Sequence, residues 1–125
     1  MATVQQYSFV CAPAMAQYAA LACPQLDRSA DLAAYREKRD LMAGLLAEHF
    51  ELAPVDGAFY IYARVPAPWP GGQRFVEAAI ARNVLVIPGA VFSEHDTHIR
   101  LCYTVPEAPL RAGAAILGEL AATGP

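Results

Sequence analysis

The chain has 125 residues and a mass of 13.4 kDa, with 56% hydrophobic and 17% charged residues. This length and composition predict one compact domain over residues 1–125, which buries about two-thirds of its unfolded surface, and they exclude a disordered tail or a multidomain protein. The formal net charge of -3 leaves no basic stripe that could follow phosphates, so a nucleic-acid partner is not expected.

Residues 1–26 carry no charged side chain. A signal peptide needs a basic start, and the first basic residue here is Arg28, so export is not expected. Polar residues and a proline interrupt any membrane-spanning helix, namely Gln5, Gln6, Ser8, Pro13 and Gln17. We therefore expect a cytoplasmic protein without a membrane partner, in which this segment is buried or lies at an interface.

The three cysteines, Cys11, Cys23 and Cys102, are odd in number, widely spaced and free of any CxxC pattern. This usage suits small, reduced core residues in a cytosolic protein rather than a disulfide framework.

Two helices are expected first in the chain. Residues 1–12 show no helical period, whereas Pro13 suits a first helical turn and predicts a helix over 13–23 that Pro24 ends. Asp27 or Ser29 can cap a second, longer helix. Its apolar residues recur at helical spacing: Leu32, Tyr35, Met42, Leu46 and Phe50.

Strands and short helices alternate in the middle of the chain. After Gly57, the aromatic and β-branched alternation of 58–65 predicts a strand. It places Phe59, Ile61, Ala63 and Val65 on one face and Tyr60, Tyr62 and Arg64 on the other. A proline- and glycine-rich loop around Trp69 follows, then a short amphipathic helix over 75–80 and a buried strand over 84–87.

The last third predicts a strand over 98–105 and a helix from Glu107 to the Gly124-Pro125 stop. Alternation places Ile99, Leu101, Tyr103 and Val105 on the apolar face of the strand and His98, Arg100, Cys102 and Thr104 on the polar face. This order of elements predicts a two-layer α+β domain with a small mixed or antiparallel sheet packed against helices.

Arg100 is the residue most indicative of function. A guanidinium in the middle of a strand needs a carboxylate, a phosphate or solvent, and arginine suits a bidentate carboxylate clamp. The alternative is an ordinary surface arginine, or one ion-paired with Glu94 or Asp96.

Other candidate sites are weaker. His95 and His98 with two nearby acids have a spacing that metals use, but a polar turn before a strand is the favoured interpretation, so no metal is expected. Ser93 lacks the elbow of a hydrolase nucleophile, and no glycine pattern cradles phosphate. Lys38, the single lysine, lies on a charged helix face and is a poor Schiff-base candidate.

Together, these segments resemble the C-terminal small domain of class I/II aminotransferases, the pyridoxal-phosphate enzymes of fold type I. The resemblance covers nearly the whole chain. It lies in QQYSFVCAPAMAQYAALA, YREKRDLMAGLL, GAFYIYARV and VLVIPGAVFSEHDTHIRLCYT.

The resemblance implies that Arg100 pairs with the α-carboxylate of an amino-acid or 2-oxo-acid substrate. It also implies that residues 1–12 end the connection from a large domain. Five residues would shape the cleft: Pro88, Gly89 and Phe92 near the substrate, and Gly57 and Phe59 in the small-domain sheet. Ser93 stands where many members have glycine.

The family's cofactor lysine and phosphate-binding residues have no counterpart here. The chain is therefore expected to be the inactive C-terminal part of an aminotransferase parent that binds pyridoxal phosphate, with no cofactor and no catalytic residue of its own. A homodimer, or association through the uncharged N-terminal segment, is expected. Other fold type I reactions also use a carboxylate arginine, and a free-standing, non-catalytic ligand-binding or protein-interaction module is the alternative function.

Overall fold

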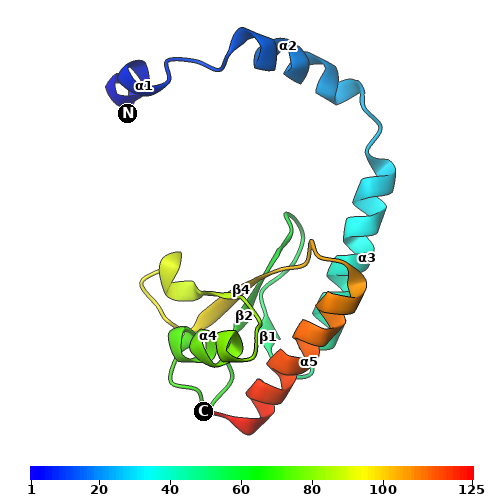
Figure 1. Cartoon of the computed structure of the whole chain (residues 1–125), viewed down its shortest axis with the longest axis vertical. Helices are drawn as coiled ribbons and strands as arrows, with labels where there is room; N and C mark the ends of the chain where they lie inside the picture. The colour runs from blue at the N-terminus through cyan, green and yellow to red at the C-terminus, as the bar shows by residue number, and fades with distance from the viewer. The chain divides into compact units, whose positions relative to one another are not determined.

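The structure is a computed structural model that describes the whole chain, residues 1–125. The chain divides into two compact units, Met1–Ala30 and Asp31–Pro125. Figure 1 shows the whole chain and labels its α-helices and the strands β1, β2 and β4.

The first unit is helical. It contains α1 (Ala2–Ser8), α2 (Ala14–Ala22) and a 3₁₀ turn, η1 (Cys23–Gln25). The helix predicted over 13–23 is confirmed, whereas α1 was not predicted because its residues lack a helical apolar period. All residues of the first unit are exposed, so of the two expected alternatives burial within this chain is wrong, and a position at an interface stays a prediction.

The cysteines also differ from expectation. Cys11, Cys23 and Cys102 are all exposed free thiols rather than core residues. The first two lie in the exposed N-terminal unit, and Cys102 lies on the face of the sheet that no helix covers, where strand alternation places it.

Helix α3 (Ser29–Leu46) leads into the core of the second unit. The Ser29 amide N–H donates to Asp27 Oδ1 at 2.9 Å, as predicted for a cap, and this backbone hydrogen bond lowers the pKa of Asp27. Met42 and Leu46 are buried, but Leu32 and Tyr35 are 51% and 42% exposed. Only the second half of the apolar stripe is therefore packed in this chain.

The sheet has four antiparallel strands in the order β1-β2-β4-β3, which confirms the α+β class. They are β1 (Glu51–Leu52), β2 (Tyr60–Arg64), β3 (Ile87–Pro88) and β4 (His98–Cys102). In the central pair Ile61 lies opposite Leu101 and Ala63 opposite Ile99, all four buried. The predicted alternation is confirmed within β2 and β4, which are both shorter than the predicted strands. Phe59 and Val105, predicted on the apolar faces, lie outside these strands and are 43% and 41% exposed.

Two strand predictions need correction. The run 84–87 forms ladder contacts only from Ile87 onward, and Leu85 is 83% exposed, because β3 is a short edge strand beside β4. Strand β1 was not predicted, since two residues carry too little alternation to be recognised.

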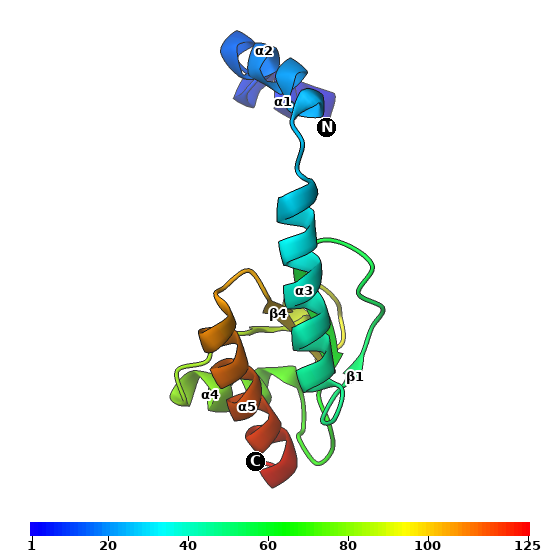
Figure 2. The same ribbon diagram turned by 90° about the vertical axis from the view of Figure 1, so that its right-hand side faces the viewer.

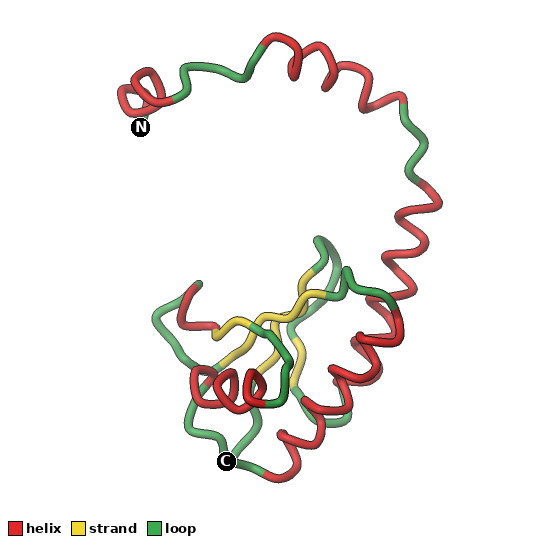
Figure 3. Tube along the Cα trace, in the orientation of Figure 1, coloured by secondary structure: helices red, strands yellow, loops and turns green.

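Helices cover one face of the sheet (Figure 3). Besides α3 they are α4 (Gly72–Ala81) and α5 (Glu107–Thr123), and α3 and α5 run side by side in both views (Figures 1 and 2). The largest fully buried side chains join the strands to all three helices: Leu46, Ile61, Phe75, Ile99 and Leu117. None of the helices combines the length and the hydropathy that a membrane-spanning segment requires.

Candidate functional site

The face of the sheet opposite the helices is only partly covered. It carries the polar-face residues of β2 and β4, all exposed or half-buried: Tyr60, Tyr62, Arg64, His98, Arg100 and Cys102. Because one face of each strand is packed against the helices, alternation turns these side chains to the other side. Tyr62 and His98 stack there, with ring centroids 4.6 Å apart and planes at 4°.

Arg100 is held between two aromatic rings on this face. Its guanidinium carbon lies 4.2 Å from the Tyr60 ring centroid and 4.0 Å from the Phe92 ring centroid. Contacts of this kind between a cation and an aromatic face stabilise by about 0.5–2 kcal/mol, depending on desolvation. Phe59 also packs against Tyr60, with the centroids of the two rings 4.5 Å apart.

Arg100 has no acidic partner. The ion pair with Glu94 or Asp96, weighed as the alternative, is absent, and the buried Nε of Arg100 has no hydrogen-bond partner. A guanidinium stays charged at any ordinary pH. When no acidic side chain compensates this positive charge, the charge favours the binding of an anion. The two Nη atoms of Arg100 are not among the buried atoms that lack a partner.

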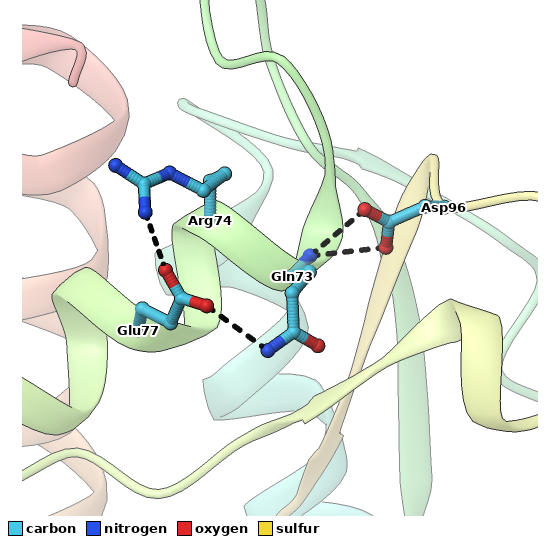
Figure 4. Close-up of polar contacts among 4 residues, drawn as sticks. All are labelled: Gln73, Arg74, Glu77 and Asp96. Carbon is cyan, nitrogen blue, oxygen red and sulfur yellow. Dashed lines mark hydrogen bonds and ion pairs between the residues drawn. The ribbon is translucent and has the colours of Figure 1, made fainter.

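Asp96 is used elsewhere, at the start of helix α4. Its two carboxylate oxygens both accept a hydrogen bond from the backbone N–H of Gln73, at 3.0 and 3.1 Å (Figure 4). Its carbonyl oxygen accepts the Gly72 amide N–H at 2.9 Å. Asp96 therefore caps a helix that is distant in sequence and does not pair with Arg100.

A tight turn presents Phe92 to Arg100. The amides of Phe92 and Ser93 donate to the Gly89 carbonyl at 2.8 and 3.0 Å and close the 3₁₀ turn η2 (Gly89–Val91). A Cβ on Gly89 would lie 2.5 Å from Tyr62 Oη and 2.8 Å from the His98 carbonyl oxygen. Only glycine fits this approach to the sheet.

Ser93 fits this turn without needing the freedom of glycine. The non-glycine residues with positive φ are Val10, Ala58 and Asn83, so Ser93 has an ordinary backbone conformation. Its Oγ accepts the His95 amide N–H at 3.1 Å and lies 3.0 Å from the His95 carbonyl, to which it donates. The departure from the family pattern is thus compatible with the turn.

The structure brings together some of the predicted site residues and separates others. Phe92 contacts Arg100, and Pro88 pairs with Ile99, the neighbour of Arg100 on β4. Phe59 contacts Tyr60 and not Arg100 itself. Gly57 lies outside the sheet, in a hollow shared with α3 residues and Tyr103. No group of His, Cys, Asp or Glu side chains is arranged to hold a metal.

Tyr60 was not identified from the sequence. Alternation places it on the same face as Tyr62, and nothing in the spacing distinguishes the two rings. The strand register distinguishes them. It places Arg100 opposite Tyr62, and the guanidinium lies over the ring of the diagonal neighbour, Tyr60.

Comparison with known proteins finds aminotransferases that are similar to this chain. No protein-family model matches the chain. Over 96% of its length it is 32% identical to a probable aspartate aminotransferase of Methanocaldococcus jannaschii, of which it covers 33%. An aminotransferase structure from Mycobacterium tuberculosis superposes with a TM-score of 0.82 at 26% identity, over 98% of this chain and 34% of that one.

A Thermus thermophilus aspartate aminotransferase variant superposes with a TM-score of 0.75 at 28% identity, over 94% of this chain and 34% of the other. The chain therefore spans about a third of the length of the relatives it matches. The resemblance to aminotransferases expected from the sequence is confirmed.

Proposed function

We propose that this chain, which is homologous to the aminotransferases over nearly its whole length, is the C-terminal small domain of a pyridoxal-phosphate-dependent aminotransferase of fold type I. The intact parent would transfer an amino group between an amino acid and a 2-oxo acid. Its cytoplasmic location stays a prediction from the sequence.

Arg100 would bind the α-carboxylate that both substrates share. The observation that carries this role is the guanidinium without any acidic partner, held on the open face of the sheet. A planar carboxylate matches the two Nη donors, and charge-assisted bonds of this kind are roughly twice as strong as neutral ones. One such clamp would orient both substrates in the same way.

The residues of this chain do not themselves form a pyridoxal-phosphate site. Lys38 is the single lysine; its Nζ lies 3.5 Å from the Thr104 carbonyl and 5.7 Å from the Tyr35 ring centroid, on the helical side of the unit. The cofactor would be held by other parts of the parent, where it supplies the electron sink for amino transfer. We expect the 125-residue chain to be inactive even with added pyridoxal phosphate.

The experiment is kinetic and uses the native protein that contains this chain. Arg100→Ala should lower kcat/KM for amino acids by about 30-fold or more, since truncating one partner of a buried charge pair costs about 2–5 kcal/mol. Arg111→Ala is the matched control, because Arg111 is exposed on α5 and paired with Glu107 at 2.8 Å. Equal kcat/KM for the Arg100→Ala and native proteins would refute the clamp.

The size of the native polypeptide, measured by mass spectrometry in its source cells, distinguishes the two functions. A polypeptide much larger than 13.4 kDa with a cofactor lysine would support the aminotransferase. A polypeptide of 13.4 kDa would favour the non-catalytic module.

A further inference from the structure

We infer that Tyr60 and Phe92 are positioning residues, which act through Arg100 and set its affinity for a carboxylate. The inference rests on the proposed clamp function of Arg100. It concerns two aromatic side chains from separate elements, one on β2 and one directly after η2.

The first step is geometric. The centroids of the two rings lie 4.2 and 4.0 Å from the guanidinium carbon. The rings therefore replace water molecules that would contact the guanidinium of a free arginine. A guanidinium forms its hydrogen bonds through N–H groups at its edge, and contacts with ring faces leave that edge available. The aromatic contacts therefore hold the donors in place without consuming them.

The second step is electrostatic. An acidic side chain would hold Arg100 equally well, but it would neutralise the charge and compete with the ligand. The aromatic rings hold the cation and leave its full charge for an incoming anion. The Nε of Arg100 is also buried, and electrostatic attraction is stronger where water is excluded.

The third step concerns entropy. An exposed arginine side chain loses rotamer freedom when a ligand fixes it. In this chain Tyr60 and Phe92 restrict the guanidinium before any ligand arrives, and Phe92 is itself fixed by the two hydrogen bonds of its turn to Gly89. Preorganisation of this kind raises affinity without a new contact to the ligand.

The test uses nuclear magnetic resonance of the 125-residue chain, with the Arg100 Nε–Hε signal as the reporter and propionate as the carboxylate probe. In the unchanged chain this signal should be shifted by the ring currents and restricted in motion, and propionate should move it. Tyr60→Leu and Phe92→Leu should each abolish part of the ring-current shift, increase the side-chain mobility and weaken propionate binding by about three- to thirtyfold.

Two further variants separate positioning from general damage to the fold. Tyr60→Phe keeps the ring and should retain the affinity. Tyr35→Leu removes a ring of similar exposure beside another cation, Lys38, and should change neither the Arg100 signal nor the affinity.

The outcomes distinguish the positioning role of Tyr60 and Phe92 from the proposed clamp function of Arg100. Propionate binding in Tyr60→Leu and Phe92→Leu equal to that of the unchanged chain would overturn the positioning role and leave the clamp intact. A ring-shifted Arg100 signal that propionate does not move in the unchanged chain would overturn the clamp, and the inference with it.

Discussion

Tyr103 shows how a single side chain can make the stability of this domain depend on pH. It is 2% exposed, and its hydroxyl donates to the Ala58 carbonyl at 2.6 Å. Burial raises the pKa of Tyr103 above its ordinary value of 10.0, and the positive charge of Arg39 offsets part of this effect. The folded chain therefore holds this proton more tightly than the unfolded chain.

The direction in which stability changes with pH follows from that difference. The stability contributed by the protonated Tyr103 is complete below pH 10.0 and is lost as the pH rises through the raised value. Tyr103→Phe should cost about 0.5–1.5 kcal/mol at neutral pH through the lost hydrogen bond. The variant should also lose less stability than the unchanged chain above pH 10.0, as measured by urea unfolding.

The control for this prediction is Tyr35→Phe, since Tyr35 is 42% exposed. It should reproduce the pH profile of the unchanged chain. Parallel profiles for Tyr103→Phe and the unchanged chain above pH 10.0 would contradict the role of Tyr103.

At the scale of elements, the start of helix α4 depends on a residue 23 positions away. Gly71 precedes the helix and provides no capping side chain, and Asp96 supplies both acceptors instead. A Cβ on Gly71 would lie 2.5 Å from Asp96 Oδ2, and one on Gly72 would collide with the His98 carbonyl oxygen. The two glycines let β4 and its preceding turn approach the helix closely enough for the cap.

Asp96→Ala should destabilise the domain by about 0.5–2 kcal/mol, the usual cost of a lost helix cap. Chemical denaturation followed by circular dichroism measures the change. Asp96→Asn keeps one acceptor oxygen and should lower the stability less. Glu94→Ala, on the same turn, should leave the stability almost unchanged. If Asp96→Ala unfolded at the same denaturant concentration as Glu94→Ala, the cap would contribute nothing to stability.

At the scale of the whole molecule, all the buried hydrophobic residues lie between Met42 and Ala121. The first unit contributes no buried residue, and it exposes large apolar side chains: Met1, Val4, Tyr7, Phe9, Val10, Met15, Tyr18, Leu21 and Leu26. Such surfaces drive association in water.

Removal of residues 1–30 should therefore leave the sheet and its helices folded while reducing self-association. We expect the full chain to form dimers or larger species in light scattering and the shortened chain, Asp31–Pro125, to be closer to a monomer. The denaturant midpoint of the sheet should change little. Loss of cooperative unfolding after the deletion would show that the first unit supports the core.

The sequence correctly predicted the long strands, the helices with clear apolar periods and the polar-face position of Arg100, because alternation and helical spacing are local properties. It could not determine the short strands β1 and β3, which exist only by pairing with a longer neighbour. It also could not show that Asp96 caps α4 or that Tyr60 and Phe92 enclose Arg100. Those contacts join distant segments, and only the tertiary structure sets the register that brings them together.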